Sequence, residues 1–354
     1  EVSFNKLKWI NPCFAIPKSE PGKWRKIMDC SLLKKFLCAT HFIMEDVSNL
    51  RSILQPKDWM IKIDLESAFH HIQVDKELMP FLGFSFNQKY FLYKAMCFGI
   101  KHAPLVFHKT LRPVIKFIRE VVMVRIISYC DDIIFLYQDL EELKEKKQQI
   151  INILTNFGWK ISVRKSVLEP ARVVEFLGWK IDSDLDQLSM TDHRQKKMIR
   201  MLGQRRRIVQ NKRLVKVKFL ASFIGSLNFL GLQIKRGGLH LKKLNKIKAW
   251  AALTRGWNSS VYLNMQVLKE LFWWKTIIQK NKPIQATLIS PIGILATDAS
   301  KTNCGATLKM SHPDLEILFH GKWSSNWHLT SSNQREAAGI LCALRRSETY
   351  LRER

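Results

Sequence analysis

Short apolar runs that lead into carboxylates mark the predicted strands in the first half of the chain. Residues 59–64, Trp-Met-Ile-Lys-Ile-Asp, predict a strand that ends at Asp64. Residues 121–128 and 133–137 predict the two strands of a hairpin around the tetrad Tyr129-Cys130-Asp131-Asp132. The pattern therefore places three aspartates at the ends of apolar strands.

Other segments predict further strands and a set of helices. Residues 9–28 predict a hairpin with a turn at Pro17–Gly22, and residues 159–163 and 173–180 predict two more strands. Apolar residues recur at helical spacing over residues 103–120 and, with charged partners, over 139–157. From Ile292 the strand pattern returns, at 294–297, 305–310 and 315–323, and a helix is predicted from about Ser332 past Leu344.

Between residues 191 and 250 the chain is strongly basic. Asp192 is the single carboxylate of this stretch, which also contains an apolar helical segment around Gly225. The whole chain of 354 residues has 58 basic and 30 acidic side chains, a formal net charge of +28. Such a charge attracts polyanions, so nucleic acid is the first candidate partner and an anionic membrane surface the second. A solvated face without a partner is the remaining alternative.

Cysteine usage and hydropathy exclude several classes of protein. The seven cysteines are scattered without a CxxC pair, which argues against a zinc site and a disulfide framework and favours a reducing compartment. No apolar run reaches the length of a membrane span. The chain starts Glu1-Val2-Ser3 without a signal-peptide pattern, so we expect a piece of a longer protein.

The paired aspartates of the tetrad carry the strongest chemical signal. Two neighbouring carboxylates in a tight turn repel one another and lose hydration, unless a cation compensates them. Mg²⁺, with Mn²⁺ as a substitute, is the hard cation that such oxygen ligands prefer. An exposed turn is the alternative, because Asp is a good turn former. If the strand that ends at Asp64 pairs with the hairpin, Asp64, Asp131 and Asp132 form a set that can hold two ions for phosphoryl transfer. Glu66 is a rival ligand, and the Leu65 carbonyl a further oxygen.

The order of these motifs resembles the reverse transcriptases of retroviruses and LTR-type retrotransposons. The form of residues 159–177 and of the C-terminal part is most similar to DIRS-type, tyrosine-recombinase elements. The resemblance rests on the following segments: Pro12–Asp29, Asp64–Phe69, Phe98-Gly99, Ala103-Pro104, Tyr129–Asp132, Lys165 and Phe176-Leu177-Gly178.

The resemblance implies roles around the incoming nucleotide. Lys18 and Arg25 would clasp the triphosphate, Arg through paired hydrogen bonds and Lys as a point charge. Phe69 would block a 2′-hydroxyl, and Phe98-Gly99 would pack on the nucleotide, although Cys97 stands where a proline is frequent in the family. Lys165 would protonate the leaving pyrophosphate. A solvated hairpin rim and a plain core aromatic are the alternatives for the basic residues and for Phe69.

The resemblance also interprets the C-terminal half. The basic stretch would be a thumb that neutralises phosphates, with the following residues as its nucleic-acid contacts: Arg205, Arg206, Arg207, Lys212 and Arg213. Residues 291–354 resemble the first half of an RNase H domain, with Asp298 and Glu336 as two of its metal ligands. Two carboxylates are too few to fix both metal ions, so we expect no RNA cleavage by this fragment.

The predicted architecture is α+β, a right-hand polymerase with fingers, an antiparallel palm sheet and a helical thumb, followed by a truncated RNase H-like α/β domain. We expect fingers and palm at 1–190, thumb at 191–250, a helical connector at 251–290 and the RNase H part at 291–354. The predicted function is RNA-directed DNA polymerase of a retrotransposon, using Mg²⁺, a template–primer and deoxynucleoside triphosphates, with no membrane partner, in the cytoplasm or nucleus. The alternative is a catalytically silent nucleic-acid-binding remnant.

Overall fold

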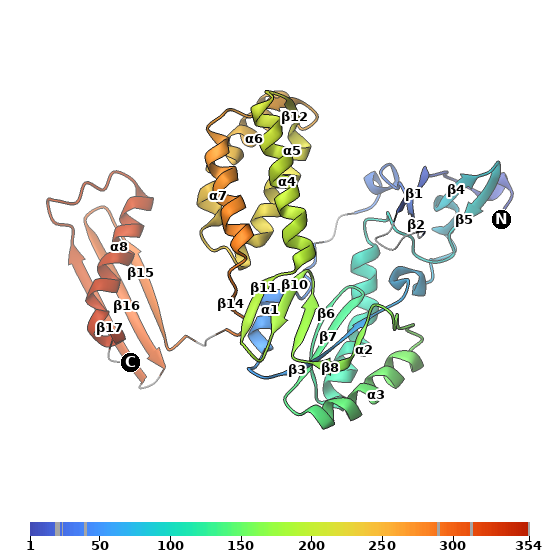
Figure 1. Cartoon of the computed structure of the whole chain (residues 1–354), viewed down its shortest axis with the longest axis horizontal. Helices are drawn as coiled ribbons and strands as arrows, with labels where there is room; N and C mark the ends of the chain where they lie inside the picture. Colours follow the sequence, from blue (N-terminus) through green and yellow to red (C-terminus); the bar gives the residue numbers. More distant parts are fainter. Residues whose placement is uncertain (18–21, 23, 39–40, 289–290, 312–313, 353–354) are drawn as a thin grey trace. The chain divides into compact units, whose positions relative to one another are not determined.

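The computed structural model describes residues 1–17, 22, 24–38, 41–288, 291–311 and 314–352. These residues divide into two compact units, 1–288 and 289–354 (Figure 1). The described residues of unit 1 include six short 3-10 helices: Phe4–Lys6, Leu33–Lys35, η3 at Ala68–His71, Met79–Phe81, η5 at Phe229–Leu232 and Gly237–Leu241.

A four-stranded antiparallel sheet in the order β6-β7-β3-β8 forms the centre of unit 1. Its strands are β3 (Trp59–Asp64), β6 (Arg125–Tyr129), β7 (Asp132–Tyr137) and β8 (Val167–Ala171). Alternate residues of β3 point to opposite faces, as strand geometry requires. Ile61 and Ile63 join the core under α2 (Ala103–Val122) and α3 (Leu140–Asn156), whereas Met60 joins a second core on the other face. Asp64 shares the face of Met60.

Two hairpins build the N-terminal region of unit 1. The strands β1 (Cys13–Pro17) and β2 (Trp24–Met28) pair with each other, as do β4 (Gly83–Phe86) and β5 (Lys89–Leu92). A separate core that includes Met28, Leu82 and Cys97 lies beneath them. The Lys26 ammonium lies 4.0 Å from the centre of the Phe84 ring and 4.7 Å from that of Tyr93. These cation–π contacts join the first hairpin to the second.

A second sheet and a helical bundle complete unit 1. The sheet has the order β14-β11-β10-β9, with β9 at Val173–Phe176, β10 at Trp179–Asp182, β11 at Gln187–Met190 and β14 at Ile284–Gln285. The helices are α1 (Val47–Ile53), α4 (Asp192–Gln210), α5 (Val217–Asn228), α6 (Lys242–Arg255) and α7 (Val267–Lys280). The short strands β12 (Leu214–Lys216) and β13 (Ser260–Tyr262) join the bundle, and one continuous core runs from the second sheet into it.

Two strand predictions are wrong in position. Residues 121–122 end helix α2, and Met123 then turns the chain in a left-handed conformation (φ 54°), so the first strand of the hairpin starts at Arg125. Residues 159–163 form only an isolated bridge between Leu65 and Ile161, and the strand beside β3 is β8 instead. The β-branched residues favoured strands in both places, but helix packing and chain reversal override that local preference.

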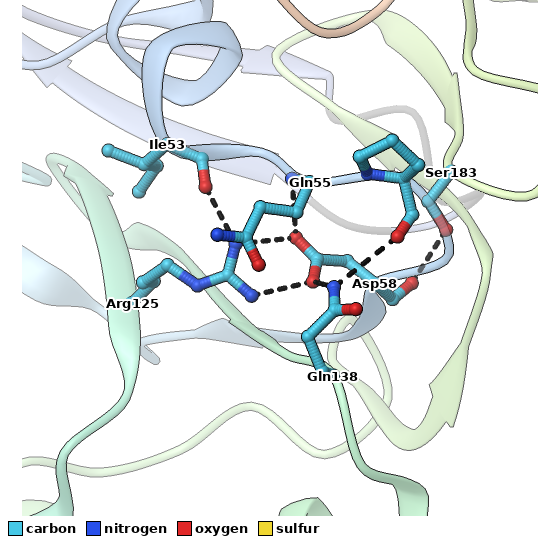
Figure 2. A network of polar contacts seen from close by, with 7 residues as sticks. Ile53, Gln55, Asp58, Arg125, Gln138 and Ser183 are labelled. Carbon is cyan, nitrogen blue, oxygen red and sulfur yellow. Dashed lines mark hydrogen bonds and ion pairs between the residues drawn. The ribbon is translucent and has the colours of Figure 1, made fainter.

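A buried polar network fixes the end of β3 that is opposite to Asp64 (Figure 2). The Asp58 side chain is 0% exposed, and the Arg125 guanidinium donates to its two oxygens at 2.6 and 2.8 Å. The Gln55 amide, the Gln138 side chain and, through the Asp58 carbonyl, the Ser183 hydroxyl complete the network. Losing one partner of a buried pair typically costs about 3–5 kcal/mol. The network therefore anchors β3 against β6, β7 and the turn after β10.

Unit 2 is a three-stranded antiparallel sheet with one long helix. The strands β15 (Gly293–Ala299), β16 (Asn303–Ser311) and β17 (Asp314–Lys322) follow one another in sheet order. Helix α8 (Ser332–Arg346) starts with a capping box of Ser331 and Gln334, packs on β15 and β16, and is followed by α9 (Glu348–Arg352).

Candidate active site

The ladder between β3 and β7 brings Asp64 directly opposite Asp132. The same register pairs Ile63 with Ile133 and Ile61 with Phe135, so both apolar sets face one core and both aspartates face the other side. The Leu65 amide donates to the Asp131 carbonyl at 3.0 Å, which ties the hairpin tip to the residue after Asp64. The backbone of Asp64 therefore lies beside that of Asp131 and Asp132.

A two-residue turn presents the aspartates. Tyr129 pairs with Asp132, which leaves Cys130 and Asp131 at the tip of the hairpin. Cys130 has a left-handed backbone (φ 50°), and its half-buried thiol lies 3.4 Å from the Met44 sulfur. A non-glycine residue in this conformation is held by its surroundings. The turn thus displaces Asp131 from the strands and keeps Asp132 in the ladder.

Two lysines offset part of the negative charge. The Lys165 ammonium lies 3.4 Å from Asp64 Oδ1, and the Lys62 ammonium lies 3.9 Å from Asp132 Oδ1. The Ser166 hydroxyl accepts a hydrogen bond from the Asp64 amide at 3.0 Å and donates to the Ser162 carbonyl. The segment around Lys165 is thereby fastened to the end of β3.

Burial raises the pKa of both ladder aspartates. For Asp64, desolvation and the Asp131 charge raise the pKa, and Lys165 and Lys62 oppose the shift. For Asp132, desolvation again dominates, the Asp131 and Asp64 charges add to it, and Lys62 is the strongest opposing charge. The folded chain therefore holds carboxylates that are incompletely compensated by its own cations.

The donor set suits a hard divalent cation, although the side chains do not yet converge. Across the described part of the chain, no three His, Cys, Asp or Glu side chains are arranged to hold a metal ion. Asp64, Asp131 and Asp132 nevertheless supply carboxylate oxygens on adjacent backbone positions. The raised pKa values of Asp64 and Asp132 show a shortage of positive charge around these two carboxylates. To hold an ion here, Asp64 and Asp132 would have to turn from Lys165 and Lys62 toward it.

An aromatic cluster lies a few residues beyond Asp64. Phe69, in η3, lies 4.9 Å from the Phe98 ring and 5.7 Å from the Phe107 ring, measured between ring centres. The Arg25 guanidinium, on β2, lies 5.3 Å from the centre of the Phe98 ring. Arg25, Phe69 and Phe98 are therefore brought together, whereas Lys18 lies outside the described residues.

Gly99 lies so close to the neighbouring backbone that no side chain can be accommodated at this position. Its φ is 125°, and a Cβ atom there would come within 1.9 Å of the Met28 carbonyl oxygen. The Met28 amide donates to the Phe98 carbonyl at 3.1 Å, so this close approach fastens the Phe98 loop to β2. Cys97 beside it is fully buried.

The predicted nucleic-acid contacts fall into two groups. Arg207, Lys212 and Arg213 are exposed. Arg205 and Arg206 are half-buried: the Arg205 guanidinium lies 5.4 Å from the Phe223 ring centre and donates to the Phe219 carbonyl at 3.4 Å. Desolvation lowers the pKa of Arg205. Arg205 therefore packs α4 against α5.

In unit 2, Asp298 lies near the end of β15 and Glu336 in the second turn of α8. Asp298 is exposed and Glu336 half-buried. One turn after Glu336, a Cβ on Gly339 would lie 3.8 Å from the Asp298 carbonyl. The two carboxylates are thus carried by elements that contact each other.

The sequence interpretation missed Lys62 and the bonding role of Ser166. A signal for Lys62 existed: it precedes Asp64 by two residues in a strand, and residues at that spacing share one face. Ser166 gave no local signal, because its bond to Asp64 spans 102 residues.

Residues 16–181 match the family model described as reverse transcriptase (RNA-dependent DNA polymerase). Residues 16–181 therefore form a reverse transcriptase domain. Its curated relatives include the genome polyprotein of Petunia vein clearing virus, 28% identical over 48% of this chain and 8% of the polyprotein. The transposon Tf2-3 polyprotein of Schizosaccharomyces pombe is 24% identical over 97% of this chain and 24% of its own length. The chain thus spans a minor part of these polyproteins.

Solved structures show the same polymerase fold. A foamy viral protease–reverse transcriptase in complex with double-stranded DNA superposes with a TM-score of 0.63 at 18% identity, over 96% of this chain and 56% of that one. A second, in complex with an RNA/DNA hybrid, has a TM-score of 0.62 at 17% identity, over 96% of this chain and 43% of that one. Both confirm the predicted polymerase architecture around the reverse transcriptase domain. In the described residues, no helix is both long and apolar enough to cross a bilayer.

Proposed function

We propose that this chain acts as the RNA-directed DNA polymerase of a retrotransposon. The observation that carries the proposal is the register that sets Asp64 against Asp132, beside Asp131 at the hairpin tip. The reverse transcriptase domain and its relatives in retroelement polyproteins support it. The template–primer would be an RNA–DNA or DNA–DNA duplex, the kinds of nucleic acid bound in the similar solved structures.

In this proposal Asp64, Asp131 and Asp132 hold Mg²⁺, or Mn²⁺ in its place. When bound by these three residues, such ions would supply positive charge for an in-line phosphoryl transfer. The chain itself supplies alignment: β3 and β7 fix the aspartates in one ladder, and the buried network around Asp58 holds the far end of β3. Positioning of this kind accounts for much of the rate of phosphoryl transfer.

The neighbouring residues would bind the nucleotide and the leaving group. Arg25, held beside Phe98, and Lys18 would contact the triphosphate. Phe69 would pack under the sugar and reject a 2′-hydroxyl, and Gly99 would let the backbone approach the nucleotide. Lys165, beside Asp64, would deliver a proton to the pyrophosphate.

The test is extension of a DNA primer on an RNA template with Mg²⁺ and deoxynucleotides. We expect Asp132→Asn to reduce extension by at least about a thousandfold, because the variant loses one ligand charge at the reacting centre. Glu120→Gln, at an exposed pair with Lys116 on α2, is the matched control and should extend normally. Full activity of Asp132→Asn would refute the proposal, and binding of template–primer without any extension by the unaltered chain would favour the nucleic-acid-binding remnant.

For unit 2 we propose a partial RNase H-like domain in which Asp298 and Glu336 are metal ligands. Two carboxylates do not fix two ions, so the chain as given should leave the RNA of an RNA–DNA hybrid intact. Incubation of a labelled hybrid with the protein and Mn²⁺ measures this. Cleavage that Asp298→Asn abolishes would contradict the expectation.

The domain bounds, the subfamily and the compartment are also proposals. We propose fingers and palm at 1–190, a thumb at 191–250, a connector at 251–290 and a DIRS-type affiliation, with action in the cytoplasm or nucleus. Helix α6 crosses position 250 and α7 packs on α4, so thumb and connector share one bundle. A tyrosine-recombinase domain in the reading frame downstream of Arg354 would support the affiliation, and an integrase of another type would count against it.

A further inference from the structure

Lys62 lies on the acidic face of the central sheet without a role in the proposed chemistry. It precedes Asp64 by two residues on β3, so both side chains leave the same face. The ladder pairs Lys62 with Ile134 on β7 and with Val167 on β8. The neighbouring strands therefore fix the Lys62 backbone on both sides, two residues before Asp64, which pairs with Asp132.

The two lysines of the site differ in their surroundings. The Lys165 side chain is 53% exposed and belongs to a turn at the rim. The Lys62 side chain is 19% exposed and reaches Asp132, whose side chain is 33% exposed. Interactions between charges strengthen as water is excluded, so the Lys62 charge acts on the site more strongly than its 3.9 Å separation would suggest for exposed groups.

We propose that Lys62 is a built-in counter-ion of the acidic site, which neutralises Asp132 in the metal-free chain and competes with the divalent cation for that carboxylate. The inference rests on the proposed function, because it assigns Lys62 a part in filling the same site. Lys62 thus acts on the site through Asp132. It keeps Asp132 compensated without metal, and it raises the cation concentration at which the site fills.

Two substitutions separate charge from packing. Lys62→Met keeps an unbranched side chain of similar length and removes the charge, whereas Lys62→Arg keeps the charge. Lys180→Met is the matched control, since Lys180 is an exposed strand lysine on β10. A lysine that serves only to pack its stem would tolerate Lys62→Met without any change in metal affinity.

The experiment titrates Mn²⁺ into the full chain and follows free Mn²⁺ by electron paramagnetic resonance. We expect Lys62→Met to lower the dissociation constant about tenfold, because a unit charge close to the ion is removed. Lys62→Arg and Lys180→Met should bind as the unaltered chain does. In a chelator, Lys62→Met should also melt at a lower temperature than the unaltered chain, and saturating Mn²⁺ should remove that difference.

An unchanged Mn²⁺ dissociation constant in Lys62→Met would overturn the inference, as would weaker binding. These outcomes differ from failure of the proposed function itself. If the unaltered chain neither binds Mn²⁺ at the site nor extends a primer, the polymerase proposal fails. If it does both and Lys62→Met binds no more tightly, only the role of Lys62 fails.

Discussion

At the scale of single residues, the proposed active site brings carboxylates and lysines of the chain close to one another. Asp64 and Asp132 lie in the ladder, Asp131 lies at the turn, and Lys62 and Lys165 supply partial compensation. The tetrad and the residue types of this site could be predicted from the sequence. Lys62 could also have been predicted, because its spacing from Asp64 places both side chains on the same face of the strand. Ser166 could not, because its contact depends on how distant segments fold together.

The raised pKa values of Asp64 and Asp132 predict how metal-free stability depends on pH. These carboxyls bind protons more tightly in the folded chain than in the unfolded chain, whose pKa is near the ordinary 3.8. Stability should therefore fall as the pH rises from that value through the raised folded-state pKa. Asp132→Asn removes one such group, so at pH 7 in a chelator it should unfold at a higher urea concentration than the unaltered chain. A lower urea midpoint for Asp132→Asn would contradict the burial of an incompletely compensated charge.

The packing of Phe69 predicts that the site discriminates between ribonucleotides and deoxynucleotides. Its ring packs between Phe98 and Phe107, which leaves it little freedom to move away from a larger sugar. Phe69→Ala should raise the relative efficiency of ribonucleotide incorporation by about tenfold or more, the effect of losing a steric contact worth roughly 1–3 kcal/mol. Single-nucleotide insertion with matched ribo- and deoxynucleotides measures kcat/KM for each. Phe117→Ala, on the exposed side of α2, is the control. Equal loss of both activities would indicate a plain core aromatic instead.

At the scale of elements, strands and helices with a regular apolar period were predicted well from the sequence, whereas the positions of chain reversals were predicted poorly. The strand at 59–64 and the helix from residue 103 match β3 and α2, since each has a clear apolar face. The strand expected at 173–180 is instead two strands, β9 and β10, because Leu177 and Gly178 both adopt positive φ angles. Gly178 is a sequence signal for that turn. Leu177 is not, because the hairpin imposes its positive φ angle.

The bundle helices divide the basic residues by role, and this division can be measured. Arg207 is exposed on α4, whereas Arg205 packs over Phe223. Arg207→Ala should weaken template–primer binding and reduce the slope of log affinity against log salt by about 0.9 for one lost phosphate contact, with unchanged stability. Arg205→Ala should lower the melting temperature as well. An unchanged salt slope for Arg207→Ala would place the nucleic acid elsewhere.

At the scale of the whole molecule, each of the two units carries carboxylates that we propose as metal ligands. Unit 1 assembles three aspartates from two paired strands, and unit 2 offers Asp298 and Glu336 on a strand and a helix. The polymerase fold was expected from the resemblance of the motif order to reverse transcriptases, and β3 and β7 align Asp64 with Asp132 within that fold. No low-complexity linker marks the division of the chain after Leu288, and its local signal is the strand pattern that returns from Ile292.

The central claim is that Asp64, Asp131 and Asp132 share divalent cations. The most direct measurement is anomalous diffraction from a complex of the chain with template–primer, an incoming nucleotide and Mn²⁺. We expect Mn²⁺ within about 2.1 Å of carboxylate oxygens of Asp64 and Asp132, with Lys165 released from Asp64. Mn²⁺ bound elsewhere, while Asp64 and Asp132 stay paired with their lysines, would contradict it.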